Sequence, residues 1–411
     1  HTTLFRSSPP AAGGGHQPQP RGIFVKRLLL ALLLSLALAA PASAEDEIVV
    51  GLLSDLSGPT SAVGVPYSEG IKDAGKYLNE NGGVAGKKLK IIEVDYAYNA
   101  QQALSAYKRL VSQDKILFLQ GWGTQDTEAL TKFVGRDKIP TISASYSAHL
   151  TDPEKAPYNF FVAADYSTQV RGALKYFKDN WKESRAPKVA FIYPDHPYGL
   201  APIAAAKEYA KELGFEIVGE ENVALNAMDA MAQLLRLQKA EPDYCWIGGT
   251  TPSTAIIMKD AQKLGMKTTF FCNIWGVDES LVSLAGEAAN GAFSLQTAVV
   301  YGQDVPGMKV IEKLTDGKPK MTHYIRGFAS MLVMAEGLRL AAEKGELTGP
   351  SIKDALETLR DFDPMGLTPA ISYFPNDHRP NMSVYLYKIE NGKMVEAALE
   401  TLERKPEWLG K

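Results

Sequence analysis

The sequence lacks the features that mark several large classes of protein. Its 411 residues carry 44 lysines and arginines against 47 aspartates and glutamates, so the net charge is −3. No basic block in the body of the chain offers the phosphate-neutralising patch that a nucleic-acid binder needs, so no nucleic-acid partner is expected. Two cysteines in a chain of this length also exclude a small disulfide-stapled scaffold.

The two cysteines, Cys245 and Cys272, each lie in an apolar run typical of a buried strand. Two interpretations stay open. The favoured one is a pair of inert core thiols, because the geometric window for a disulfide is narrow. The other is a disulfide between neighbouring strands, which an oxidising compartment would permit.

Acidic residues are absent from residues 1–44, which leaves 40 basic and 47 acidic groups, a net charge of −7, on the rest of the chain. Lys26 and Arg27 precede an apolar run over residues 28–40, and Ala42-Ser43-Ala44 follows. This order is typical of a secretory signal cleaved after Ala44. The alternative is a membrane anchor, but the run would span only about 20 Å of a hydrocarbon core of ~30 Å. We expect residues 1–44 to be an upstream segment and signal peptide.

Short apolar runs alternate with segments of helical period along the rest of the chain, which predicts an α/β fold with parallel sheets and crossover helices. Glycine and proline turns separate the runs. The expected strands are 47–54, 89–95, 116–120, 139–143, 160–163, 189–193, 216–219, 244–248 and 269–272.

Nine strands are too many for one comfortable sheet, and the pattern restarts at Val189 after a helical stretch over 167–182. We therefore predict two Rossmann-like, doubly wound lobes. Later elements are a long helix over 318–344, a shorter one over 352–359, and extended segments at 370–374 and 384–389. The predicted division is 45–164 plus 298–373 for lobe 1, and 165–297 plus 374–411 for lobe 2.

Catalytic and cofactor-binding motifs are also missing. The sequence contains no G-x-S-x-G, H-E-x-x-H or C-x-x-C pattern. Gly121-Trp122-Gly123 lacks the third glycine of a dinucleotide fingerprint, and Gly82-Gly-Val-Ala-Gly86 precedes a strand and is a turn. The histidines are scattered without metal-ligand spacing. We expect no catalytic site, cofactor or metal, and hence no enzyme.

Hydroxyls, glycines and aromatic residues do follow the predicted strands, at the edge where a parallel sheet binds ligands. Trp122-Gly123-Thr124 follows the third strand, and Ser143-Ala-Ser145-Tyr146-Ser147 follows the fourth. Thr124 with Ser145 or Ser147 would suit a carboxylate held by hydroxyls and helix amides. The alternative for each hydroxyl is helix capping alone.

At this point the residues resemble a known family. The motifs are Glu47-Ile-Val-Val-Gly-Leu-Leu-Ser-Asp-Leu-Ser-Gly-Pro59, Asn79-Glu-Asn-Gly-Gly-Val-Ala-Gly-Lys-Lys-Leu89, Ile139-Pro-Thr-Ile-Ser143 and Pro194-Asp-His-Pro-Tyr198-Gly199. They resemble the type I periplasmic solute-binding proteins of ABC transporters, in the branch for leucine, isoleucine and valine. The resemblance implies two lobes, joined by three crossings, that close on a small ligand like a Venus flytrap in the periplasm.

The resemblance also implies roles for individual residues. Thr124, Ser145 and Ser147 would hold the ligand carboxylate, Asp165 would stand near the hinge, and Tyr198 would contact the ligand from the second lobe.

One position departs from the family. Amino-acid binders carry a glutamate for the ligand ammonium just before a Gly-Val pair, and here Trp275 precedes Gly276-Val277. Asp278 or Glu279 could substitute for it. Otherwise Trp275 would join an aromatic pocket for an amine-free carboxylate, unless these rings are only packing. The other rings of that pocket would be Trp122, Tyr146, Tyr166 and Tyr198.

The leading hypothesis is therefore a monomeric periplasmic receptor that captures a small-molecule carboxylate, an amino acid or an aromatic acid, for an ABC permease in the inner membrane. An extracytoplasmic sensor with the same fold and no transport role is the alternative. A secreted hydrolase is a third reading, which a perturbed acid/base pair in the cleft would favour.

Overall fold

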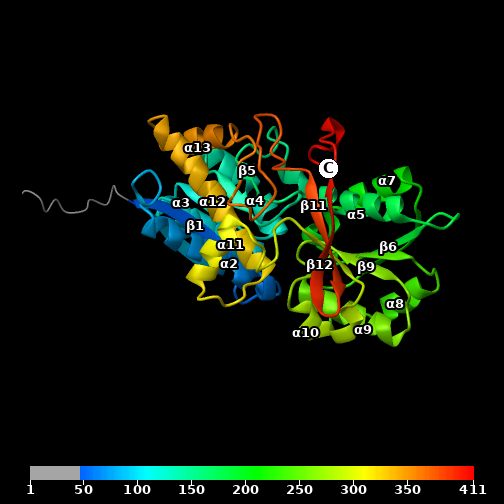
Figure 1. Cartoon of the computed structure of the whole chain (residues 1–411). Helices are drawn as coiled ribbons and strands as arrows, with labels where there is room; N and C mark the ends of the chain where they lie inside the picture. Colours follow the sequence, from blue (N-terminus) through cyan, green and yellow to red (C-terminus); the bar gives the residue numbers. More distant parts are fainter. Residues whose placement is uncertain (1–46) are drawn as a thin grey trace, which may run out of the picture. The chain divides into compact units, whose positions relative to one another are not determined.

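The computed structural model describes residues 47–411, and the expected signal peptide lies outside this range. Two separate β-sheets, each covered by helices, make up the described chain (Figure 1). This is the predicted α/β architecture.

The first sheet is wholly parallel, with strand order β2-β1-β3-β4-β5. Helices return the chain between its strands, as a parallel sheet requires. Its strands are β1 (Glu47–Ser54), β2 (Lys88–Asp95), β3 (Phe118–Gly121), β4 (Thr141–Ser143) and β5 (Asn159–Phe160).

The second sheet has the order β12-β11-β10-β9-β8-β6-β7. Its parallel part, β7-β6-β8-β9-β10, repeats the strand order of the first sheet, and an antiparallel hairpin adds β11 and β12 at one edge. Its strands are β6 (Lys188–Tyr193), β7 (Glu216–Asn222), β8 (Tyr244–Ile247), β9 (Thr269–Cys272), β10 (Phe293–Gln296), β11 (Ser383–Glu390) and β12 (Lys393–Thr401).

The helices fall into two groups. Those packed with the first sheet are α2 (Ser61–Glu80), α3 (Ala100–Ser112), α4 (Thr124–Asp137), α11 (Pro306–Leu314), α12 (Thr322–Glu343) and α13 (Gly349–Leu356). Those that belong with the second sheet are α5 (Tyr166–Asn180), α6 (Pro197–Leu200), α7 (Ile203–Glu212), α8 (Met231–Gln238), α9 (Thr251–Lys263) and α10 (Leu281–Ala285).

Strand alternation divides the second sheet between two apolar cores. Ala190 and Ile192 point into one core, whereas Val189 and Phe191 point into the other. Cys245 and Cys272 lie in the first of these cores as free, buried thiols. Burial raises the pKa of both thiols above the ordinary range, so they stay protonated and unreactive. The favoured interpretation of the cysteines is confirmed.

The helices α2 and α12 cross at unusually short range, which two glycines permit. A Cβ on Gly70 would lie 2.0 Å from the Tyr324 carbonyl oxygen, and a Cβ on Gly327 would lie 2.0 Å from that of Tyr67. This crossing places Tyr67 and the start of α12 beside the strand ends.

The structure departs from the sequence-based expectations in several segments. The strand expected over 160–163 is shorter and earlier, at Asn159–Phe160. The strands β10 and β12 were not expected, and the segment 370–374 forms only isolated bridges, such as that between Phe362 and Ile371, instead of a strand. All strands of the first sheet lie within 45–164, and those of the second within 165–297 or 374–411. The lobe boundaries themselves stay a prediction. None of the helices within residues 47–411 is both long and apolar enough to cross a membrane.

Candidate functional site

One cavity is lined by residues that all follow the carboxyl ends of strands. In an open parallel sheet this edge is where ligands bind. Both sheets contribute, and eight different strands lead into the lining. The lining residues are Thr60, Val63, Tyr98, Trp122, Gly123, Thr124, Ala144, Tyr166, Tyr198, Thr250 and Trp275.

The cavity is small and carries no charged side chain in its lining. Its volume of about 20 Å³ holds about one water molecule. A small-molecule ligand needs several hundred Å³, so binding requires the walls to separate or a side chain to leave.

A chain of hydrogen bonds fixes the wall that follows β1 and β3. The Asp55 carboxylate accepts from the Thr60 amide and from the Thr60 hydroxyl, at 2.8 and 2.6 Å. The Thr60 oxygen in turn accepts from the Trp122 indole N–H at 2.9 Å. The Trp122 ring is therefore held in one orientation.

Thr124 begins α4, directly after the N-cap residue Gly123. The Ser145 hydroxyl donates to the Thr124 Oγ1 at 2.8 Å, which brings two hydroxyls to the positive end of the helix. Gly123 must be a glycine here, because a Cβ would lie 2.3 Å from Asp126 Oδ1 and 2.5 Å from the Tyr98 ring. The arrangement suits an anion held without a cation.

Trp275 follows β9 in the second sheet, and its indole lies among aromatic rings that follow strands of the first. It stacks on Tyr146, with centroids 5.7 Å apart and an interplanar angle of 8°, and meets Trp122 edge-on at 4.9 Å. Its N–H donates to the Tyr166 hydroxyl at 3.0 Å. The side chain is 4% exposed and fills the space between the two sets of strand ends.

Behind Trp275, a buried charge network supports the indole. The Arg326 guanidinium lies 4.3 Å from the indole centroid, a cation–π contact. Arg326 contacts His323 Nδ1, and His323 Nε2 lies 2.8 Å from Asp278 Oδ2. Burial alone would raise the pKa of Asp278, but hydrogen bonds from His323, Ser280 and Thr251 outweigh burial and lower that pKa below its ordinary value. Burial and the Arg326 charge lower the pKa of His323, so a neutral imidazole links the two ions.

Known protein families and solved structures resemble this chain in sequence and fold. Residues 47–393 match the family model for periplasmic binding proteins. The chain belongs to the periplasmic binding protein family. Its branch is that of the type I proteins related to the Leu/Ile/Val-binding proteins, so it is a solute-binding protein and not an enzyme.

Three relatives of this binding protein illustrate the likeness. The leucine-specific-binding protein of Salmonella typhimurium is 27% identical over 297 residues, which cover 71% of this chain and 78% of its own. The ABC transporter substrate-binding protein of Aeropyrum pernix is 32% identical, with a TM-score of 0.81, over 88% of this chain and 98% of its own. A branched-chain amino acid ABC transporter structure from Thermus thermophilus with bound valine is 25% identical, with a TM-score of 0.82, over 87% and 97%.

The structure brings four of the eight expected site residues to the cavity lining and places the others behind it. Trp122, Thr124, Tyr198 and Trp275 line the cavity, as does Tyr166. The Tyr198 hydroxyl donates to the Gly249 carbonyl at 2.7 Å and accepts from Asn273.

The remaining four lie one layer back. Ser145 bonds Thr124, and Tyr146 stacks on Trp275. The Ser147 hydroxyl donates to Glu128 Oε1 at 2.8 Å. Asp165 caps α5 by accepting from the Thr168 amide at 2.8 Å. All eight stay proposals for ligand contact.

Four lining residues were missed in the sequence: Thr60, Val63, Tyr98 and Thr250. Thr60 lies just beyond the Ser57-Gly58-Pro59 turn that was noticed, and Tyr98 follows β2 with a left-handed φ of 57°. Thr250 follows β8 through two glycines, much as Thr124 follows β3 through Gly-Trp-Gly. This repeated pattern, a glycine and then a threonine directly after a strand, could have identified Thr250 from the sequence.

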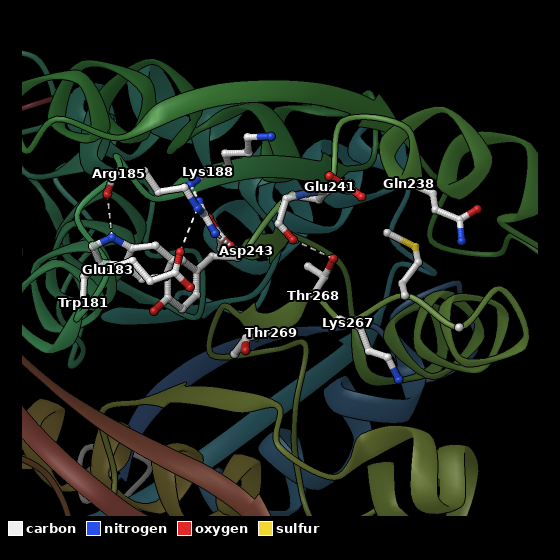
Figure 2. A pocket seen from close by; sticks show the side chains of 14 residues that line it. Trp181, Glu183, Arg185, Lys188, Gln238, Glu241, Asp243, Lys267, Thr268 and Thr269 are labelled. Atoms are coloured by element: carbon white, nitrogen blue, oxygen red, sulfur yellow. Dashed lines mark hydrogen bonds and ion pairs between the residues drawn. The ribbon is translucent and has the colours of Figure 1, made fainter.

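A larger hollow of about 580 Å³ lies at the opposite, amino ends of β6, β8 and β9 (Figure 2). Several of its polar groups are already paired: Arg185 contacts both oxygens of Asp243 at 2.6 Å, and Asp243 also accepts from the Lys188 amide. It is therefore not the favoured ligand site. Within residues 47–411, no cluster of three or more potential metal-ligating side chains is arranged to hold an ion.

Proposed function

We propose that this protein is the periplasmic substrate-binding component of an ABC-type uptake transporter, and that its ligand is a small carboxylate without an amine. The ligand would bind between the two sets of strand ends and favour closure. The charge-free cavity lining, with Trp275 in it, is the observation that carries the proposal. The family membership and the names of the relatives support the transport role.

The acids near Trp275 are engaged elsewhere, which argues against their pairing with a ligand ammonium. Asp278 accepts from Thr251 and Ser280 as well as contacting His323. Glu279 accepts from the backbone amide of Thr322 with both oxygens at 3.1 Å. An amino acid would bury its ammonium against the indole without a carboxylate, which costs several kcal/mol, and a cation–π contact returns only about 0.5–2 kcal/mol.

Calorimetric titration of the mature protein with leucine, phenylalanine and benzoate-type acids tests the ligand class. We expect an aryl acid to bind at least about tenfold more tightly than leucine, a difference of about 1.4 kcal/mol. Thr124→Ala should weaken that acid by about 1.5–3 kcal/mol, the worth of a hydrogen bond to a charged group. Thr131→Ala, further along α4 and bonded to the Thr127 carbonyl, is the control and should bind normally.

A branched-chain amino acid is the second candidate ligand. The leucine-specific relative and the valine-bound structure favour it. Tight leucine binding without any response to aryl acids would select this candidate and would mean that Asp278 or Glu279 turns inward. Loss of cellular uptake of the ligand on gene deletion would support transport, whereas unchanged uptake would favour the sensor.

A further inference from the structure

The cavity lies between two equivalent strand-to-helix turns, one from each sheet. In the shared strand order, β3 and β8 occupy the same third position. Gly123-Thr124 leads from β3 into α4, and Gly249-Thr250 leads from β8 into α9. Thr124 and Thr250 both line the cavity, so two helix N-termini meet there. Only the first of these turns has a ligand-binding role in the proposal above.

The second turn carries a buried polar group without a partner. Thr250 is 2% exposed and borders the cavity. Its side chain faces the Ser253 amide in the capping box of α9, but its hydroxyl group finds no acceptor for its proton. Its amide is already used, as a donor to the Ser253 hydroxyl at 3.1 Å. A buried hydroxyl left unpaired is costly, and a ligand acceptor would relieve that cost.

Charge decides which kind of acceptor fits. Asp278, 1% exposed and ionised, accepts from the Thr251 hydroxyl at 2.6 Å, next to the start of α9. Asp278 is already linked to Arg326 through His323, and no cation lines the cavity, so a second carboxylate on the ligand would lie near Asp278 without a positive partner. A carbonyl oxygen would accept from Thr250 without that repulsion.

We propose that Thr250 and the N-terminus of α9 form a second ligand subsite, which binds an uncharged carbonyl oxygen at the end of the ligand remote from its carboxylate. The subsite rests on the function proposed above, and it narrows the ligand class to oxo acids and amide-bearing acids. The two equivalent turns would then hold the two ends of one molecule.

Paired probes of equal shape test the subsite by calorimetric titration. The aryl pair is 4-acetylbenzoate and 4-isopropylbenzoate, and the aliphatic pair is 5-oxohexanoate and 5-methylhexanoate. Terephthalate supplies a charged acceptor. We expect the carbonyl member of at least one pair to bind about fivefold or more tightly than its partner, and terephthalate to bind more weakly than that member.

Three variants test whether the Thr250 hydroxyl causes the preference for the carbonyl-bearing acid. Thr250→Val should abolish it, and Thr250→Ser, which keeps the hydroxyl, should retain it. Thr254→Val changes a buried threonine one turn further along α9 that does not line the cavity, and should also retain it. Equal binding within both pairs, or a preference that survives in Thr250→Val, would overturn the subsite while leaving the proposed function intact. If no acid in either pair binds, the proposed function falls and the subsite with it.

Discussion

At the scale of single residues, Asp126 is the most strained electrostatic feature next to the site. It lies in the first turn of α4, is 2% exposed, and accepts from the Tyr96 hydroxyl at 2.7 Å through one oxygen only. Burial, with a smaller contribution from the Asp55 charge, raises the pKa of Asp126 from 3.8 to about 7. The folded protein therefore holds a proton that the unfolded chain releases.

The raised pKa of Asp126 makes the unfolding free energy depend on pH. Stability from Asp126 is complete below about pH 4 and declines as the pH rises to about 7, by as much as about 4 kcal/mol. Asp126→Asn mimics the protonated carboxyl at every pH. Its unfolding free energy, relative to the unchanged protein, should therefore increase between about pH 4 and about pH 8 in urea titrations.

Asp137, at the end of the same helix, gives a control of opposite sign. Hydrogen bonds from Arg136 lower the pKa of Asp137, so its contribution to stability is present above about pH 4 and lost as the pH falls. The unfolding free energy of Asp137→Asn, relative to that of the unchanged protein, should therefore be lower at high pH than at low pH. If both variants shift in the same direction, the carboxyl of Asp126 is ionised in the folded state.

Some residues of the site could be predicted from the sequence, and others could not. Thr124 and Trp275 could be predicted to line the site, because residues after parallel strands converge at one edge. Tyr98 could not, because its left-handed backbone, which turns the ring toward His196 at 5.4 Å, has no signature in the residue type. The sequence predicts that Ser147 holds the ligand, but in the structure its hydroxyl donates to Glu128. Sequence position alone does not reveal that hydrogen bond.

At the scale of elements, the crossing of α2 and α12 involves Tyr67, whose ring packs against Trp122 and Trp275. Gly327→Ala would place a methyl group against the Tyr67 carbonyl and force the helices apart. We expect a loss of about 2–3 kcal/mol or more in unfolding free energy. Gly135→Ala is the matched control, because a Cβ there meets only Pro157, at 4.0 Å. In that half-buried helical position, which has room for a methyl group, alanine should stabilise by about 0.5–1 kcal/mol.

Equal stability of Gly327→Ala and Gly135→Ala would contradict this prediction and would show that α12 can shift without cost. Ligand affinity measured on the same Gly327→Ala protein should also decline, because Arg326 beside it supports the Trp275 ring.

Element prediction failed where side-chain pattern and burial disagree. In β10, Ser294 and Gln296 are fully buried yet polar, and both bond the Val277 carbonyl, so the strand has no continuous apolar run. The edge strand β12 has no buried residue, and its partly buried positions, Met394, Ala398 and Glu400, do not coincide with a regular alternation of apolar and polar residues in the sequence. The strands β1 and β9, buried along most of their length, were predicted with their observed bounds.

At the scale of the whole molecule, the position of Trp275 leads us to expect that ligand entry is coupled to the separation of the two sheets. The ring is carried by the second sheet but belongs to the apolar core around the first. Ligand-free protein in solution should populate a form in which this contact is broken, and a tight acid should favour closure. Small-angle scattering should then give a smaller radius of gyration with ligand. An equal radius in both states would mean that Trp275 alone moves and the lobes do not.

The edge-on pair of Trp122 and Trp275 has an optical consequence. Two indoles with centroids 4.9 Å apart, held in a fixed and asymmetric orientation, couple their electronic transitions. The near-ultraviolet circular dichroism of the closed protein should contain a paired positive and negative band that Trp275→Phe removes. Because ligand binding requires the cavity walls to separate or a side chain to leave, this band should change when a ligand is added, and the protein would report binding in a spectropolarimeter without any label.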